Sequence, residues 1–114
     1  MNRVLVSTVT ECLRELADRS YQERVWATFA APEQSSFEEA VCGLYDDSGL
    51  GNELDKSHAV FSAVADAKLR VLGDKLSAID SNRAPLEIIK DPKMEEVRVL
   101  ARELLDLLAK QGVS

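Results

Sequence analysis

The strongest constraint on the fold is the apolar repeat that runs through residues 93–111. Apolar residues recur there at intervals of three and four, the spacing that places side chains on one face of an α-helix. Asp91 and Pro92 precede the repeat as an N-cap and a proline at the first helical position, and Gly112 ends it. The apolar face comprises Met94, Val97, Leu100, Ala101, Leu104, Leu105, Leu107 and Leu108. A face this wide predicts either a central packing position or an oligomer seam.

Shorter helical repeats with charged residues between the apolar ones precede this segment. They lie at about residues 3–18, 21–30, 37–46 and 60–80. Asn2, Ser20 and Ser36 stand where N-caps are expected, and Ser57 with His58 leads into the fourth segment. We therefore predict an all-α fold, a single domain over residues 1–114 built as a bundle of four or five helices.

Three details of this prediction concern segments with weaker patterns. In the first helix, Leu5 and Cys12 are expected on the apolar face. Residues 52–56 add at most one helical turn. Residues 82–89 contain Pro85 and are expected to be a loop, with Leu86, Ile88 and Ile89 packed on the core.

The segment 60–80 carries two apolar stripes, which implies two neighbours. The main stripe includes Phe61, Leu69, Leu72 and Leu76, and the second consists of Val64, Ala67, Val71 and Ala78. The second neighbour is either another part of the chain, which we prefer, or a second copy or partner chain. The apolar excess on this helix and on the last one predicts a homodimer. Gly73 indicates close packing against another backbone.

Residues 46–55 form an acidic, glycine-punctuated segment between helical repeats. As a calcium loop starting at Asp46, it lacks the oxygen ligand at the fifth position, which is Leu50, and the bidentate Glu at the twelfth, which is Ser57. No metal site is therefore expected, and a glycine turn between helices is the simplest interpretation. Alternatively the segment docks a partner. The candidate interaction residues are Asp46, Asp47, Leu50, Glu53 and Asp55, with the acids solvated.

Trp26, the sole tryptophan, is a sixth candidate interaction residue. A lone tryptophan is usually found in the core or at its edge, whereas an exposed one is a strong anchor for a partner.

Charge and composition exclude several classes of function. The chain has 14 basic and 20 acidic residues, a net charge of −6, and its basic residues are scattered, so nucleic acid is not an expected partner whereas a basic protein is. No apolar run approaches the ~20 residues that cross a bilayer. Cys12 and Cys42 form no C-x-x-C motif, and we expect free thiols, no cofactor and a cytoplasmic location.

Catalytic signatures are weak. His58 follows Asp55 by three residues, but no nucleophile elbow and no phosphate-binding glycine motif accompanies them. A small enzyme or ligand-binding protein, with a site between helices near Asp46, Asp47, Asp55 and His58, remains the alternative. Converging polar groups in a pocket would favour it.

The function that the sequence favours is a non-enzymatic protein–protein interaction module whose acidic face meets a basic partner. A small acidic bacterial protein that neutralises its partner, as immunity proteins do, is one version, suggested by fold-level analogy. A purely structural homodimer is a third possibility. An exposed apolar patch would favour interaction.

Overall fold

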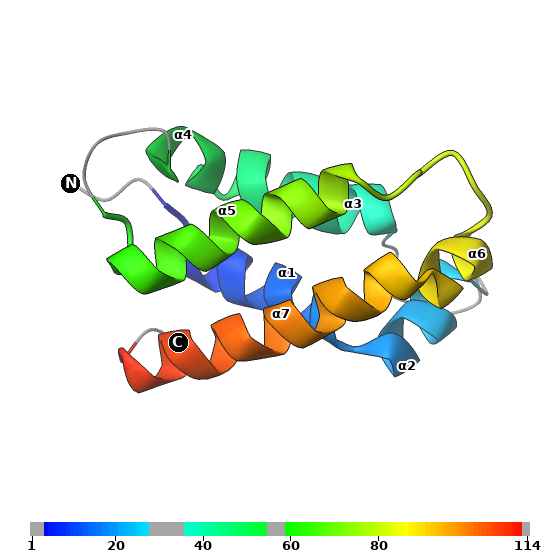
Figure 1. Cartoon of the computed structure of the whole chain (residues 1–114). Coiled ribbons are helices and arrows are strands. Elements are labelled where there is room, and N and C mark those ends of the chain that lie inside the picture. The colour runs from blue at the N-terminus through cyan, green and yellow to red at the C-terminus, as the bar shows by residue number, and fades with distance from the viewer. Residues whose placement is uncertain (1–3, 28–35, 55–58, 113–114) are drawn as a thin grey trace.

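The computed structural model describes residues 4–27, 36–54 and 59–112, and every regular element in these ranges is helical (Figure 1). The elements are α1 (Val6–Ala17), α2 (Arg19–Tyr21) with its π-helical continuation η1 (Gln22–Trp26), α3 (Phe37–Cys42) with its π-helical continuation η2 (Gly43–Asp47), α4 (Leu50–Leu54), α5 (Ala63–Ser77), α6 (Pro85–Lys90) and α7 (Pro92–Lys110). The all-α class is confirmed. With each continuation counted as one helix, the described residues contain seven helices, five of which have seven residues or more and lie at the five predicted segments. The short helices α4 and α6 are additional.

The predicted caps at the strongest helices are confirmed. The Asp91 carboxylate accepts a hydrogen bond from the backbone N–H of Lys93 at 2.9 Å, Pro92 is the first residue of α7, and Gly112 has a φ of 78°. The Ser36 hydroxyl accepts from the N–H of Glu39 at 3.1 Å at the start of α3. These contacts satisfy N–H groups that have no partner inside the helix.

Other helices begin at different residues from those predicted. Asp18, not Ser20, caps α2 and accepts from the N–H of Tyr21 at 3.1 Å. Ser62 caps α5 and accepts from the N–H of Ala65 at 3.1 Å, so this helix begins at Ala63 instead of residue 60. α2 and α5 start where a side-chain oxygen reaches an unpaired N–H, and several residues in the sequence can supply such an oxygen. Asn2, residues 28–30, Asp55, Ser57 and His58 lie outside the described ranges.

Three local predictions are wrong. Leu5 is the N-cap of α1, not part of its apolar face, and its side chain is 56% exposed. Residues 85–90 form the short helix α6 instead of a loop, because a proline at the first helical position needs no N–H partner and has a suitable φ. Ile88 and Ile89 are buried as predicted, whereas Leu86 is exposed.

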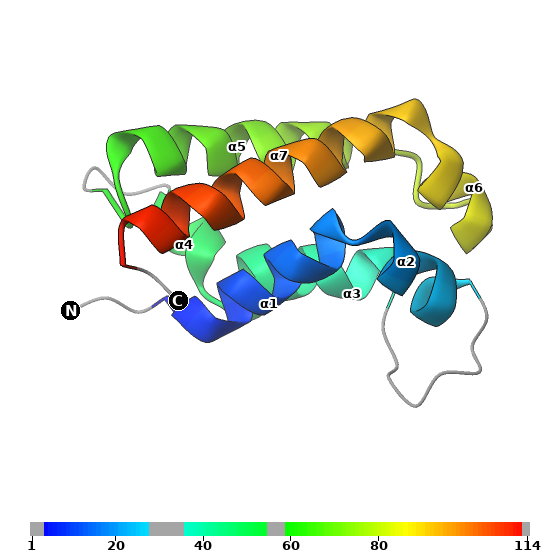
Figure 2. The same ribbon diagram turned by 90° about the horizontal axis from the view of Figure 1, so that it is seen from below.

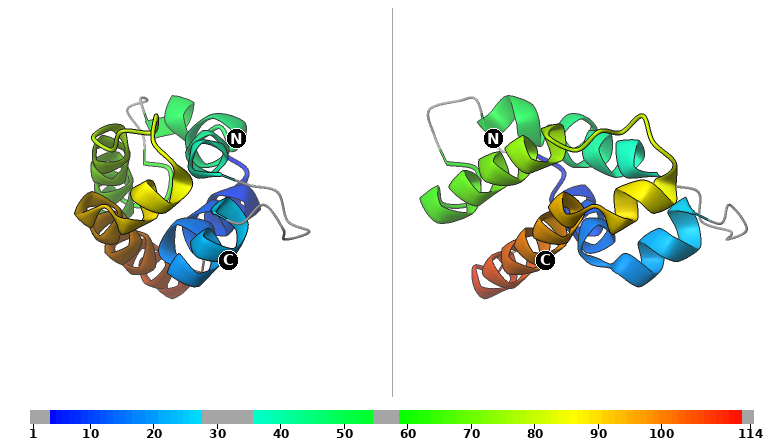
Figure 3. Two further views of the ribbon diagram at one scale, coloured as in Figure 1. Left: turned by 90° about the vertical axis from the view of Figure 1, so that its right-hand side faces the viewer. Right: turned by 45° about the vertical axis from the view of Figure 1, so that its right-hand side comes forward.

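The helices surround one apolar core. α5 and α7 run antiparallel side by side, and α1 packs against α7 on the other side (Figures 1 and 2). Seen end-on, α1, α3, α5 and α7 enclose the centre of the molecule (Figure 3). Fully buried side chains from these and neighbouring helices fill it, among them Leu13, Leu16, Leu44, Leu69, Leu72, Met94 and Leu104.

A buried polar cluster joins three helices. Arg98, predicted on the polar face of the last helix, is only 1% exposed and donates from Nη1 to the Gln22 side-chain oxygen at 2.9 Å. The amide nitrogen of Gln22 donates to the carbonyl oxygens of Glu15 and Leu16 at 3.0 and 2.9 Å. Arg98 also forms an ion pair with Glu95 at 2.9 Å. The cluster therefore ties η1 to the end of α1 and to α7.

Candidate functional site

The predicted contact loop does not form one surface. Asp46 and Asp47 at the end of η2 are exposed as expected, but Leu50 is fully buried and Glu53 is 4% exposed. Gly49, with a φ of 82°, ends the preceding helix and α4 starts at the next residue, which turns Leu50 and Glu53 toward the protein. The expectation that Glu53 is solvated is therefore wrong, Leu50 has no exposed surface that a partner could contact, and Asp55 lies outside the described residues.

Trp26 belongs to the core and is not a surface anchor. Its side chain is 1% exposed, and its indole N–H donates to the Glu15 carboxylate at 2.8 Å. The ring packs edge-on against Phe37, with centroids 6.1 Å apart and an interplanar angle of 81°. The polar end of the indole is satisfied inside the molecule. Trp26 therefore presents no binding group to a partner.

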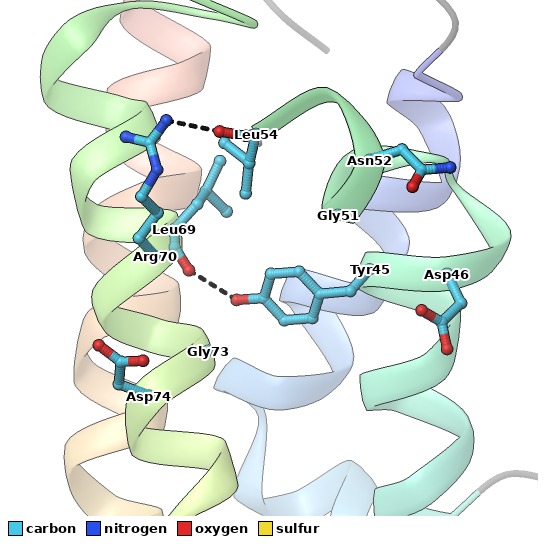
Figure 4. Close-up of a pocket in the computed structure, with 9 residues that line it drawn as sticks. All are labelled: Tyr45, Asp46, Gly51, Asn52, Leu54, Leu69, Arg70, Gly73 and Asp74. Atoms are coloured by element: carbon cyan, nitrogen blue, oxygen red, sulfur yellow. Dashed lines mark hydrogen bonds between the residues drawn. The ribbon is translucent and has the colours of Figure 1, made fainter. Parts of the chain in front are cut away.

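A polar pocket of about 750 Å³ opens between η2, α4 and α5 (Figure 4). The Tyr45 ring crosses it, and its hydroxyl donates to the carbonyl oxygen of Leu69 at 2.7 Å. Arg70 donates from Nη2 to the carbonyl oxygen of Leu54 at 2.8 Å. Asp46 and Asp74 lie on opposite sides of the Tyr45 ring (Figure 4). Burial and the Asp74 charge raise the pKa of Tyr45.

This pocket brings together only part of the predicted alternative site. Asp46 lines it, whereas Asp47 does not, and Asp55 and His58 lie outside the described residues. The hydroxyl and the guanidinium that line it are already engaged by backbone carbonyls, so they hold α4 and η2 against α5. Polar groups that converge on an empty point, as in a catalytic site, are not seen among these residues.

Gly73 faces the same pocket and corrects another prediction. A Cβ built at Gly73 would lie 3.4 Å from the Tyr45 hydroxyl oxygen, and its nearest neighbours all belong to that side chain. The close neighbour is therefore an aromatic ring, not another backbone.

Cys12 and Cys42 are free thiols. Burial, together with the negative charges of Glu15, Glu11 and Asp47, raises the pKa of Cys12 to about 11. Because only the thiolate is a good nucleophile, the half-buried Cys12 is unreactive at neutral pH. Within the described ranges, no three His, Cys, Asp or Glu residues are grouped so as to hold a metal ion.

The outer face of α5 and α7 is an apolar surface that the described helices leave uncovered. Contrary to our preferred interpretation, no neighbour among the described residues buries the second stripe of α5: Val64, Ala67, Val71 and Ala78 are all exposed. Val64 is 57% and Val71 46% exposed, and Val99 on α7 is 43% exposed. A groove of about 520 Å³ is lined by Val71, Lys75, Pro92, Glu95, Glu96, Val99, Leu100 and Glu103.

Charged pairs bracket the valines of this face. Lys68 forms an ion pair with Glu103 at 3.4 Å, and Lys75 forms one with Glu96 at 3.0 Å. Both pairs are substantially exposed and connect α5 with α7. Beside them, hydrogen bonding and the positive charge of Arg98 lower the pKa of Glu95, whose carboxylate is ion-paired with Arg98 at this rim of the groove.

Sequence reasoning missed Val99, which lies outside the apolar arc of its helix. The only signal is an apolar β-branched residue on a polar face, between Glu96 and Glu103 at helical spacing. Single exposed valines are common on protein surfaces, so Val99 indicates an interaction site only because the structure places Val71 of α5 next to it.

None of the described helices is both long and apolar enough to span a bilayer. No protein-family model, curated protein or solved structure matches the chain.

Proposed function

We propose that this chain is a non-enzymatic protein-interaction module that docks a partner through the α5–α7 face. We define this face by Val64, Lys68, Val71 and Lys75 on α5 and by Glu96, Val99 and Glu103 on α7. The observation that carries the proposal is the exposure of Val71 and Val99 along an apolar groove between α5 and α7, with the exposed Val64 further along α5. Contiguous apolar surface that folding leaves uncovered is typical of interaction sites.

The rim of the groove defines the chemistry of the partner. The charged residues that line it are three glutamates and one lysine, Glu95, Glu96, Glu103 and Lys75. A partner surface that presents basic side chains next to an apolar side chain is complementary to this arrangement. The expectation of a basic partner is thus retained, but its docking site is moved from the 46–55 segment to the α5–α7 face. A small protein that neutralises a basic partner is one form of this function.

The test compares three purified baits for the proteins they retain from an extract of the native cells: the wild type, the double variant Val71→Gln/Val99→Gln and the control Leu86→Gln. Glutamine removes apolar surface without adding charge and is compatible with a helix. Leu86 is 45% exposed on α6, so the control loses similar exposed apolar area elsewhere. We expect the wild type and the control to retain the same partner protein and the double variant to lose it. A further copy of this chain counts as such a partner.

Equal retention by all three baits would contradict the proposal, because the face would then be irrelevant to binding. Circular dichroism and melting temperature of each bait serve as the folding check. All three positions are exposed, so their substitution should leave the fold intact.

A ligand-binding protein is the second candidate, favoured by the size and polar lining of the Tyr45 pocket. Small cationic and anionic compounds would be screened for a rise in melting temperature, as expected for a ligand that binds only the folded state. The matched variant is Asp74→Asn, which changes one exposed wall of the pocket. A compound that raises the melting temperature of the wild type, and raises that of Asp74→Asn less, would support a ligand-binding function.

A further inference from the structure

We infer that the occupant of the α5–α7 face is a second copy of this chain, related to the first by a twofold axis parallel to the two helices. This inference rests on the proposed function and specifies the partner. The α5–α7 face requires a partner surface with basic residues beside an exposed apolar residue. The outer side of α5 is itself such a surface. Its outer row reads Val64, Lys68, Val71, Lys75.

The register between α5 and α7 makes the face self-complementary. Lys68 pairs with Glu103 and Lys75 with Glu96, so seven residues along α5 correspond to seven residues back along α7. Lys93, further toward the start of α7, donates to the carbonyl oxygen of Ala78 in the same register. Each lysine on α5 therefore lies at the same height as a glutamate on α7. Val71 lies between the two pairs, beside Val99 in the groove.

A twofold axis parallel to the helices and midway between them exchanges α5 with α7 without changing height. It places Lys68 of one copy over Glu103 of the other, and Lys75 over Glu96. The same operation places Val71 of each copy over Val99 of the other. Both ion pairs between α5 and α7 thus gain an equivalent pair between chains, and Val71 and Val99 of the two copies cover each other.

The other twofold axis in the plane of the face is excluded by charge. An axis perpendicular to the helices lays α5 over α5 and α7 over α7 in opposite directions. Centred on Val71, it brings Lys68 of one copy over Lys75 of the other. Like charges placed opposite each other are unfavourable, so the charge pattern selects the parallel axis.

The size of the face predicts a weak dimer. α5 has 15 residues. At 1.5 Å per residue the face is ~22 Å long, and two helices side by side, each ~9 Å wide, make it ~18 Å wide, so it covers on the order of 400 Å² per copy. Stable complexes bury about 800 Å² per partner, so the dimer is populated mainly at high micromolar concentrations or above.

The experiment uses charge reversal on the intact chain. A basic-face variant carries Glu96→Lys and Glu103→Lys, and an acidic-face variant carries Lys68→Glu and Lys75→Glu. Analytical ultracentrifugation is performed at about 0.15 M salt, where net charge is screened beyond ~8 Å. Circular dichroism checks each fold, since loss of the exposed intrachain pairs costs little stability. The matched control, Glu11→Lys/Glu23→Lys, makes the same change in net charge as the basic-face variant, but on exposed residues of α1 and η1.

We expect the wild type and the control to reach twice the chain mass of 12.6 kDa as concentration rises. Each face variant alone should dissociate at least about tenfold more readily, and an equimolar mixture of the two should recover the doubled mass. A wild type that stays monomeric at millimolar concentration would overturn the inference. Face variants that dimerise like the control would do so as well, and a mixture that stays monomeric would refute the proposed axis.

The two proposals fail separately. If the wild type is monomeric while the Val71→Gln/Val99→Gln bait still loses a different protein, the function stands and the second copy is not the occupant. If the wild type dimerises but the valine substitutions change neither its mass nor its retained proteins, the α5–α7 face is not the interaction surface.

Discussion

Single buried polar residues decide how the helices of this chain are joined. Arg98 is on the polar side of the sequence repeat of α7, yet the structure buries it against Gln22 and Glu95. The sequence carries no sign of this, because an arginine on a polar face is usually solvated. Burial becomes favourable only when η1, 76 residues earlier in the chain, supplies an acceptor.

Replacing Gln22 with alanine should lower the free energy of unfolding by about 2–3 kcal/mol, because a buried Arg98 nitrogen and two backbone carbonyls lose their partner. Chemical denaturation monitored by circular dichroism measures this. Arg19→Ala is the control, since it removes an exposed ion pair with Glu23 and should cost less than about 1 kcal/mol. A Gln22→Ala variant as stable as the control would show that the cluster contributes little.

Asp91 should make the stability of α7 depend on pH. Hydrogen bonds from the Lys93 N–H and from Arg83 hold the pKa of this carboxyl below its usual 3.8. The folded state therefore favours the carboxylate, so the stabilisation is present above about pH 4 and is lost as pH falls through the lowered pKa. Melting temperatures of wild type and Asp91→Asn should differ most at neutral pH and converge toward pH 2. A constant difference would contradict this assignment.

At the scale of helices, the sequence predicted the elements whose ends carry strong signals. The start of α7, with Asp91 and Pro92, and the Ser36 cap of α3 were identified correctly. α6 was missed because Pro85 was interpreted as a breaker, although it is compatible with the first turn. A proline can therefore either end a helix or begin one. Which of the two occurs depends on whether the residues after it can pack against a core.

The candidate site was less predictable than the fold. The 46–55 segment was identified as unusual, but a five-residue helix gives too few turns to show which side faces the protein. Leu50 and Glu53 are buried through packing that the local sequence does not show, whereas Trp26 lies in the core, as is usual for a lone tryptophan. The second stripe of α5 was recognised correctly as a feature. Whether this stripe is exposed or buried could not be predicted, because it depends on the position of every other helix.

Gly73→Ala should raise the free energy of unfolding by about 0.5–1 kcal/mol. Alanine favours a helix interior over glycine, and the added Cβ would make ordinary van der Waals contact with Tyr45 at 3.4 Å. Thermal and chemical denaturation measure the gain, and the fold is controlled by the near-ultraviolet signal of the aromatic residues. A loss of stability would mean that the ring cannot tolerate the methyl group.

Gly43→Ala should have the opposite sign, with a loss of about 1–2 kcal/mol. A Cβ at Gly43 would approach the Cys12 sulfur to 2.8 Å, which forces α1 and the α3–η2 helix apart. The double variant with Cys12→Ala removes the obstructing atom and should recover most of the loss. Equal losses with and without Cys12 would place the cause elsewhere.

The whole molecule should unfold as one unit. Its core draws side chains from helices along the entire described chain, and the most extensive packing joins α1 to α7. Trp26 lies in this core and α7 supplies much of the helical signal. Tryptophan fluorescence and far-ultraviolet circular dichroism should therefore give superimposable denaturation curves. Separated midpoints would reveal an independently stable subset of helices.

The pairing of α1 with α7 also determines when this protein acquires its structure during synthesis. A nascent chain that stops before Pro92 has made α1 but lacks the helix against which α1 packs most extensively. Until α7 leaves the ribosome, side chains such as Val9, Leu13 and Leu16 remain available to other hydrophobic surfaces. Chaperones that recognise exposed apolar segments should bind this intermediate and release it only after the last helix has emerged.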